Sequence, residues 1–325
     1  MLTDIVLGIQ HGDEGKGKVT HHLLKNGNYT HCIRFNGGCN AGHTIYHEGV
    51  KIVTHLIPAG VFFGVKSIIG PGCVVRADKF FEEIRMLEDH GIRTAGLVKI
   101  ASNAHITTID HVNEDRKDET IGTTKSGNGP AYRDKYARLG RRASDFSIFD
   151  KYVIDMYEEL GGTADVLMEG AQGFWLDVDW GDYPYVTSSH CGVGAAILNG
   201  INPRSIRDIW GVAKIYETYV GKKRFQPNNP VFEQIQKAGS EFGATTGRVR
   251  QCDWMDFGKL NKAIRMNGVN KLVVNKMDVL RQINKWALKN PNLNFGSEEE
   301  ICSFIETRVS NDVTQVFFSD SPEKL

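Results

Sequence analysis

A short glycine-rich stretch near the start of the chain carries the residue types that bind phosphate. Residues 12–18 read GDEGKGK, after an apolar run at 5–7 that predicts a strand and before a segment that predicts a helix. A glycine-rich turn between a strand and a helix presents backbone N–H groups, and the positive end of the helix, to an anion. Because Lys16 and Lys18 add positive charge, we expect this loop to bind the phosphates of a nucleotide.

The loop departs from the usual phosphate-loop pattern at the magnesium ligand. Gly12, Gly17 and Lys18 match G-x-x-x-x-G-K, but Val19 follows where Ser or Thr would hold Mg²⁺. Asp13 is the candidate to replace that hydroxyl. A carboxylate among phosphates is repelled unless a cation lies between them, or unless it works as a base. The alternative is a charged surface turn that binds no ligand.

A second motif, late in the chain, is typical of guanine recognition. Residues 275–278 read NKMD and follow an apolar run, so they match a strand running into N-K-x-D. The Asp carboxylate of this motif accepts hydrogen bonds from N1–H and the 2-amino group of guanine, and adenine lacks both donors. Together with the phosphate loop, the motif favours GTP over ATP. The alternative is a helix that begins with an Asp and binds nothing.

Composition excludes several classes of partner. The 325 residues include 39 basic and 39 acidic ones, so the net charge is balanced. This balance lacks the excess of positive charge that is typical of proteins that bind nucleic acid or an anionic membrane. No apolar run approaches the roughly 20 residues that span a bilayer. Six cysteines without a C-x-x-C pair indicate reduced thiols. We therefore expect a cytoplasmic protein that binds neither nucleic acid nor membrane.

Strand and helix signals alternate along the chain, without a linker or a repeat. This alternation predicts one α/β domain over residues 1–325, with a mostly parallel central sheet, flanking helices and a GTP-binding core like that of P-loop proteins. Polar stretches at 102–145 and 218–227 are expected to form long loops around a site. Predicted strands lie at 4–9, 30–35, 52–57, 67–70, 97–101, 165–169, 209–215, 271–275 and 313–318, and predicted helices at 16–26, 78–90, 146–160, 231–238, 256–267 and 297–309.

Four further segments gather polar residues around glycine. They are NAGHT at 40–44, IGTT at 121–124 continuing to GPAY at 129–132, EGAQG at 169–173 continuing to YPYVTSS at 183–189, and GATTGRVR at 243–250. With GDEGKGK and the strand before Lys276, these motifs resemble, in the same order, those of the adenylosuccinate synthetase family. The resemblance runs from residue 10 to residue 280. It implies a Mg²⁺-dependent ligase that converts IMP, L-aspartate and GTP into adenylosuccinate, GDP and phosphate.

The resemblance places the chemistry on Asp13 and His43. Transfer of the γ-phosphoryl group of GTP to O6 of IMP makes that oxygen a good leaving group, which the aspartate amine then displaces. Asp13 is implied to take the N1 proton of IMP and to bind Mg²⁺. His43 is implied to donate to phosphate oxygens as their charge develops. The Gly42 carbonyl is implied to complete the metal shell, which accounts for Val19.

The resemblance also implies which residues bind each substrate. GTP contacts fall on Gly12, Asp13, Glu14, Gly15, Lys16, Gly17, Lys18, Gly42, His43, Thr44, Arg250, Lys276, Met277 and Asp278. IMP contacts fall on Asp13, Lys16, Asn40, His43, Thr124, Arg138, Gln172, Thr187 and Arg248, with Arg138 reaching across a homodimer interface from the other subunit. L-Aspartate contacts fall on Ala244, Thr245, Thr246, Gly247, Arg248 and Arg250.

The chain departs from the family's pattern in several places. His11 stands where Trp is usual and Tyr219 where Arg is usual, and residues 222–224 are three new cations. HCGVG at 190–194 replaces the usual NTTAG, and a C-terminal guanine element is only weakly recognisable at 318–322. The length is near that of the short archaeal and viral members.

These departures leave two alternatives open. Some short viral relatives use a guanine nucleoside monophosphate, GMP or dGMP, in place of IMP and make a diaminopurine precursor. Those relatives typically lose the loop carboxylate, so the presence of Asp13 favours IMP. The second alternative is a GTP-binding switch without synthesis. A switch needs the phosphate loop and N-K-x-D, but it does not need Gln172, Thr187 or the carboxylate-binding loop at 243–250.

Overall fold

The structure is a computed structural model of the 325-residue chain, and it describes all residues except 163, 243–246 and 322–324. Its centre is a nine-stranded sheet in which every neighbouring pair of strands is parallel. In spatial order the strands are β17 (Gln315–Ser319), β14 (Lys271–Asn275), β11 (Ile206–Lys214), β1 (Leu2–Gly8), β10 (Asp165–Glu169), β2 (His31–Arg34), β5 (Lys66–Ile69), β7 (Val98–Ala101) and β9 (Val153–Ile154). The predicted α/β class with a parallel central sheet is confirmed.

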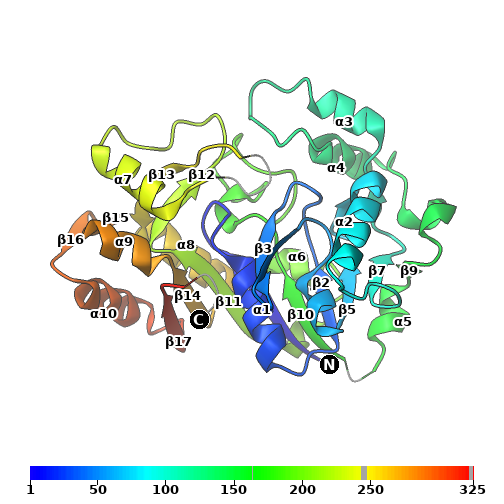
Figure 1. Ribbon diagram of the computed structural model, residues 1–325, viewed down its shortest axis with the longest axis horizontal. Helices are drawn as coiled ribbons and strands as arrows, with labels where there is room; N and C mark the ends of the chain where they lie inside the picture. The colour runs from blue at the N-terminus through cyan, green and yellow to red at the C-terminus, as the bar shows by residue number, and fades with distance from the viewer. Residues whose placement is uncertain (163, 243–246, 322–324) are drawn as a thin grey trace.

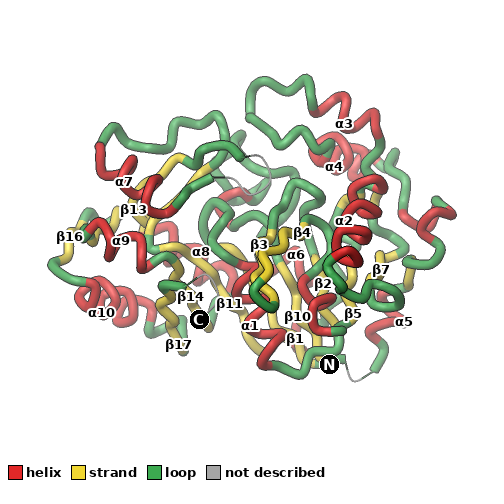
Figure 2. Tube along the Cα trace, in the orientation of Figure 1, coloured by secondary structure: helices red, strands yellow, loops and turns green. Residues whose placement is uncertain are grey.

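Helices cover the sheet and extend beyond it, as Figures 1 and 2 show. They are α1 (Lys16–Asn26), α2 (Ala77–Asp89), α3 (Ile109–Asp115), α4 (Asn128–Ala137), α5 (Met156–Leu160), α6 (Val193–Ile197), α7 (Pro230–Gly239), α8 (Phe257–Asn267), α9 (Met277–Ile283) and α10 (Glu298–Val309). A four-stranded sheet contains β12 (Tyr216–Tyr219), β13 (Gln251–Asp256), β15 (Trp286–Lys289) and β16 (Leu293–Phe295). Two small pairs are β3 (His43–His47) with β4 (Val50–Thr54) and β6 (Val74–Val75) with β8 (His105–Ile106).

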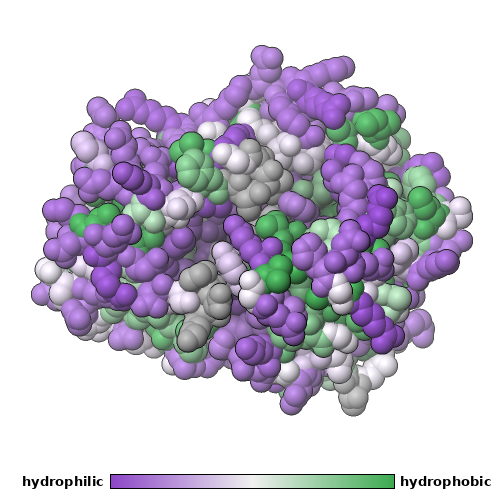
Figure 3. All heavy atoms as spheres, in the orientation of Figure 1, coloured by the Kyte–Doolittle hydropathy of each residue, from purple (hydrophilic) through white to green (hydrophobic). Residues whose placement is uncertain are grey.

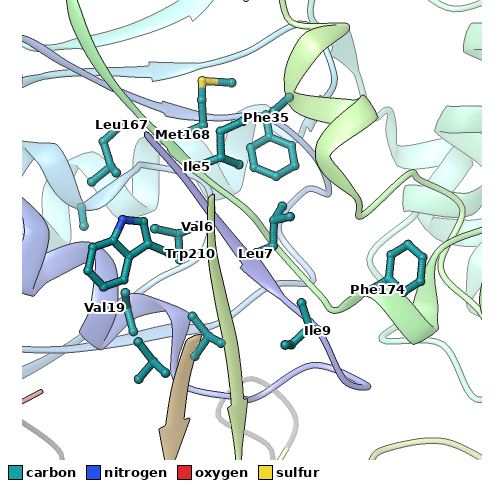
Figure 4. Close-up of a cluster of buried hydrophobic side chains, with 14 of the residues drawn as sticks. Ile5, Val6, Leu7, Ile9, Val19, Phe35, Leu167, Met168, Phe174 and Trp210 are labelled. Carbon is teal, nitrogen blue, oxygen red and sulfur yellow. The ribbon is translucent and has the colours of Figure 1, made fainter. Parts of the chain in front are cut away.

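The apolar run that follows the first residues forms the centre of the core. Figure 4 shows Ile5 and Leu7 on one side of β1, near Phe35 and Phe174, and Val6 on the other side, near Trp210 and Val19. Successive side chains of a strand point to opposite faces, so a strand buried on both faces needs a continuous apolar run. This burial fixes β1 in the middle of the sheet and so fixes the position of the loop that follows it.

Two predicted elements differ from the observed ones. The helix expected at 146–160 is wrong over most of its length, because Phe149 packs against Phe80 and Phe81, and β9 pairs with β7 at the sheet edge. Only α5 remains, and Asp155 begins it by accepting the N–H groups of Tyr157 and Glu158.

The strand expected at 52–57 is displaced. Residues 50–54 form a hairpin with β3 outside the central sheet. The strand ends at Thr54 because the Glu83 carboxylate accepts the next three backbone N–H groups, those of His55, Leu56 and Ile57, which therefore cannot pair with another strand.

Three of the motifs follow the carboxyl ends of central strands, which meet at one edge of a parallel sheet. The phosphate loop follows β1, the EGAQG segment follows β10, and the guanine motif follows β14. At that end, α3 and α4 lie on one side and α7 with β12 and β13 on the other (Figure 1). The face in Figure 3 is mainly hydrophilic, with hydrophobic residues in small groups. Within the described ranges, no helix combines the length and apolar character needed to cross a membrane.

Candidate active site

The phosphate loop is held in shape by its own carboxylate. Glu14 is buried, and its Oε1 accepts the N–H groups of Gly12 at 2.9 Å and Gln10 at 3.2 Å. Lys16 Nζ donates to Glu14 Oε2 at 2.5 Å. Gly12, Asp13 and Gly15 all have positive φ, and Gly15 is the residue before α1. Glu14 therefore shapes the loop from inside, whereas the Asp13 side chain remains 32% exposed.

The start of α1 packs closely against the strand that carries His43. A Cβ at Gly17 would lie 3.1 Å from the Thr44 carbonyl oxygen and 3.3 Å from the His43 Cβ, so only glycine fits easily. Val19 is fully buried and cannot reach a metal ion. The predicted catalytic histidine is thus beside the loop, although the two are separated in sequence by the whole of α1 and β2.

Residues of the guanine motif are tied directly to the phosphate loop. Asn275 Nδ2 donates to the Glu14 carbonyl at 2.7 Å, and Lys276 with positive φ precedes α9, whose first turn contains Asp278. Lys18 Nζ donates to Ser319 Oγ at 2.6 Å and to the Ser321 carbonyl at 2.9 Å. Burial, with Lys276 adding and Asp278 opposing, lowers the pKa of Lys18 to about 8. Lys18 therefore lies beside the predicted guanine motif and the weakly recognisable C-terminal element.

His43 is oriented by a buried carboxylate. Its Nδ1 contacts Glu169 Oε1, which also accepts from Arg34 Nη2 at 2.6 Å, while Glu169 Oε2 accepts the Ala59 N–H at 2.8 Å. Burial alone would raise the pKa of Glu169, but Arg34 and His43 outweigh it and lower the value to about 2. Burial, reinforced by Arg34, lowers the pKa of His43 to about 4 against the opposing effect of Glu169.

It follows that the imidazole of His43 is neutral near pH 7. An ionised carboxylate can only accept, so Nδ1 carries the proton and donates to Glu169, and Nε2 is the ring nitrogen that this contact does not occupy. Oriented imidazoles of this kind move protons or bind phosphate oxygens.

Two of the predicted IMP residues contact each other beside the loop. Gln172 Nε2 donates to Asn40 Oδ1 at 3.2 Å, and a Cβ at Gly12 would lie 3.9 Å from the Gln172 Cα. Gln172 has positive φ, and its Oε1 is buried without a hydrogen-bond partner in the described part of the chain. A buried amide oxygen without a partner costs free energy unless a ligand satisfies it.

Asp13 is at one end of a row of alternating charges. Arg250 Nε donates to Asp13 Oδ2 at 2.6 Å, and Arg250 Nη1 donates to Glu241 Oε2 at 2.6 Å. Lys214 Nζ lies 2.9 Å from both oxygens of Glu241, and Tyr216 donates to Oε1 at 2.5 Å. Burial would raise the pKa of Glu241, but Lys214 and Arg250 lower it to about 2. Arg250 therefore links the loop carboxylate to the buried interior.

The remaining predicted residues are distributed around this centre. Arg248 Nη1 donates to the Gly122 carbonyl at 2.8 Å, which joins the aspartate-binding motif to the IGTT segment. Thr124 donates to Ser126 Oγ, and the Thr187 N–H donates to the Leu176 carbonyl. Arg138 is exposed at the end of α4 with positive φ. Ala244, Thr245 and Thr246 lie outside the described residues, and Gly247 has positive φ.

Three of the positions that depart from the family's pattern, His11, Tyr219 and Lys223, lie together. His11 is buried, its Nε2 lies 3.2 Å from Asp182 and its Nδ1 3.2 Å from Glu217, and its ring packs edge-on against Tyr219 and Phe225. Asp182 also accepts from Lys223 and Lys259. Burial lowers the pKa of His11, but hydrogen bonds to the two carboxylates outweigh it and raise the pKa above its ordinary value. These three departures therefore form one cluster next to the loop, in which the buried imidazole is paired with carboxylates.

Sequence reasoning missed the residues behind the site. Glu169, Arg34, Glu241 and Lys214 are charged and fully or almost fully buried. Glu169 belongs to a motif and ends a strand, which was an available signal, and Arg34 ends β2 in the same way. Nothing in the sequence around Glu241 connects it to Lys214, because the contact depends on the return of the chain after α7.

Comparisons with known proteins identify the family of the chain. The model of the adenylosuccinate synthetase family matches residues 5–160 and 148–289. The adenylosuccinate synthetase of Thermodesulfovibrio yellowstonii is 36% identical, over 88% of this chain and 79% of that protein, and that of Acidothermus cellulolyticus is 38% identical, over 85% and 77%.

Two solved structures have the same fold. A fully ligated adenylosuccinate synthetase from Plasmodium falciparum has a TM-score of 0.84 at 27% identity, with 98% of this chain and 97% of that chain covered. The succinoaminodeoxyadenylate synthetase of cyanophage S-2L, bound to dGMP and to dATP as an energy donor, has a TM-score of 0.80 at 22% identity, with 99% and 93% covered. From the family match and the identities over most of its length, the chain belongs to the adenylosuccinate synthetase family.

Proposed function

We propose that the chain is a GTP-dependent ligase that forms adenylosuccinate from IMP and L-aspartate, with release of GDP and phosphate. The observation that carries this proposal is the Gln172–Asn40 pair beside Gly12, with a buried amide oxygen that a purine nucleotide would satisfy. A GTP-binding switch has no use for such a pair next to its phosphate loop. The N-K-x-D motif, tied to the same loop by Asn275, supports GTP as the phosphoryl donor.

Each group of residues in the site has its own part in the proposed reaction. Asp13 takes the N1 proton of IMP, which makes O6 nucleophilic toward the γ-phosphorus of GTP. His43, held by Glu169, binds the oxygens of the transferred phosphoryl group. Arg248 and Arg250, with the loop at 244–247, bind the carboxylates of L-aspartate, because a guanidinium pairs with a carboxylate at two points. The aspartate amine then attacks C6 and displaces phosphate.

A magnesium ion fits the donor atoms present. The Asp13 carboxylate and the Gly42 carbonyl are hard oxygen ligands of the kind that Mg²⁺ takes, and Val19 cannot contribute because it is buried and apolar. When bound there, Mg²⁺ would neutralise charge on the phosphates of GTP.

We also propose a cytoplasmic homodimer in which residues 1–325 act as one catalytic domain and Arg138 reaches the partner's IMP site. Arg138 lies in an exposed turn between Tyr136, which is 64% exposed, and Leu139, which is 74% exposed. Large apolar side chains flanking an exposed cation are typical of a surface that is covered in an oligomer.

The test is phosphate release with GTP, Mg²⁺ and L-aspartate, run in parallel with IMP, GMP and dGMP. Release with IMP, with formation of adenylosuccinate, establishes the proposal. Phosphate release with GMP or dGMP instead would show that the enzyme makes a diaminopurine precursor. Phosphate release without any nucleoside monophosphate would show a GTPase without synthetase activity. Asp13→Ala and His43→Ala should each abolish turnover in folded protein.

A further inference from the structure

We propose that Glu241 is a positioning residue, which holds Arg250 where it can leave Asp13 and bind the carboxylate of the amino-acid substrate. The inference rests on the proposed function and deepens it, since it concerns how the L-aspartate site is held. No substrate contact is assigned to Glu241. It acts only through Arg250.

The geometry gives Arg250 two partners of different character. Glu241 is completely buried and is fixed by Lys214 on both oxygens and by the Tyr216 hydroxyl. Asp13 is partly exposed in the loop and, within the part of the chain that the structure describes, is joined to the rest of the network through Arg250. The inner contact is therefore shielded from solvent and held by several partners, whereas the outer one is open to exchange.

The backbone makes the same connection. The Arg250 N–H donates to the Glu241 carbonyl at 3.0 Å, and Gln236 Nε2 donates to the Arg250 carbonyl at 2.7 Å. A Cβ at Gly239 would lie 2.5 Å from the Tyr216 hydroxyl, so α7 ends in close contact with this network. Both ends of the segment from 241 to 250 are thus fixed at one buried point, with the aspartate-binding motif between them.

The exchange follows from charge. While Arg250 pairs with Asp13, its Nε is occupied and the loop carboxylate is neutralised. A substrate carboxylate offers Arg250 a new anion, and its arrival frees Asp13 to act on Mg²⁺ and on the IMP proton. Because Glu241 keeps hold of Nη1 throughout, the guanidinium pivots and does not leave the site.

The substitution Glu241→Gln tests whether Glu241 positions Arg250, because it keeps the size and shape of the side chain but removes its charge. We expect KM for L-aspartate to rise about tenfold or more, as for other residues that orient a ligand-binding group. KM for IMP should stay within about threefold of wild type, since Asp13 is the one assigned IMP contact that the described network joins to Glu241, and Arg250 releases Asp13 when the substrate carboxylate binds.

Glu241→Gln alone leaves Lys214 buried without a counter-charge, which destabilises the fold. The double variant Glu241→Gln/Lys214→Met removes both buried charges and is made beside it. If Glu241 served only to neutralise Lys214, the double variant would recover the wild-type KM for L-aspartate, and the inference would be wrong. If Glu241 positions Arg250, the raised KM persists in a stable protein. Glu298→Gln, which breaks an exposed ion pair with Arg281, is the matched control and should change neither KM.

The remaining outcomes are also decisive. Equal rises in KM for L-aspartate, IMP and GTP would mean that the whole site is distorted, and would overturn the inference that Glu241 positions Arg250. If neither Glu241 variant folds, Arg250→Lys takes its place, because one ammonium cannot bridge two carboxylates as a guanidinium does. A wild-type KM for L-aspartate in Arg250→Lys would also overturn it. Wild-type protein that makes no adenylosuccinate would defeat the proposed function instead, so the two failures are distinguishable.

Discussion

Replacing Glu169 by Gln tests whether His43 depends on the carboxylate behind it. Glu169 accepts from His43, from Arg34 at 2.6 Å and from the Ala59 N–H at 2.8 Å. An amide offers one oxygen and turns an NH₂ group toward a donor, so at least one of these contacts becomes repulsive. His43 then loses the partner that fixes its tautomer and its ring orientation.

The structure gives the size of two separate effects. A positioned acid or base contributes about 10²–10⁴-fold to a rate, so we expect kcat to fall at least about 10²-fold with little change in KM. Arg34 is buried and keeps no ionised partner within the described residues, which costs about 3–5 kcal/mol of unfolding free energy. For a chain of this size the unfolding temperature should fall by roughly 5–10 °C.

Initial rates of adenylosuccinate formation and thermal unfolding measure the two effects in the same samples. Glu159→Gln is the control, because Glu159 also pairs with a histidine and a cation, His31 and Lys66, but lies at the opposite ends of the strands. It should leave kcat unchanged. A folded Glu169→Gln protein with wild-type kcat would refute the claim that this carboxylate orients His43.

Three further predictions follow from contacts at the edges of the site. Asp278→Asn should lower kcat/KM for GTP by roughly 10²-fold and favour xanthosine triphosphate, and an unchanged nucleotide preference in competition assays would contradict the assignment of the guanine motif. Asn275→Ala removes the donor to the Glu14 carbonyl, so KM for GTP should rise about tenfold in steady-state assays; an unchanged value would mean that the loop keeps its shape alone. Burial, reinforced by the nearby His47, lowers the pKa of His21 to about 4, whereas the unfolded chain has a value of about 6.5. The unfolded chain therefore binds a proton more readily, and the folded protein loses stability as the pH falls from 6.5 toward 4. His21→Gln should therefore reduce the drop in unfolding temperature between about pH 7.5 and pH 5, measured by calorimetry, and an undiminished drop would assign it to other groups.

The sequence was most informative where local pattern and final structure depend on the same residues. The apolar runs of β1, β10 and β14 are buried on both faces, so these continuous runs predicted strands, and Gly12 and Gly15 of the phosphate loop have the positive φ that the turn requires. Helix α1 was predicted with its observed bounds for the same reason.

Where a side chain from elsewhere decides the structure, the sequence could not predict it. Residues 146–154 have a helix-like pattern, but packing of Phe149 on α2 and pairing of β9 with β7 override it. The contacts of Glu169 and Glu241 likewise join residues that are brought together only by the fold. The predicted roles of Arg138 and of Mg²⁺ remain predictions, since each concerns a partner outside the single chain.

The central place of β1 has a consequence for synthesis of the protein on the ribosome. Leu2 pairs with Asp165 on one side and Thr3 with Ile206 on the other, so the first strand made has no neighbour in the sheet until more than half of the chain has emerged. Contacts between residues so distant in sequence slow folding. Until its neighbouring strands have been made, this apolar strand exposes hydrophobic surface and unpaired backbone groups, which favour aggregation. The phosphate loop is thus among the first segments to be translated, but the strand that carries it has both of its sheet neighbours only after β11 has been made.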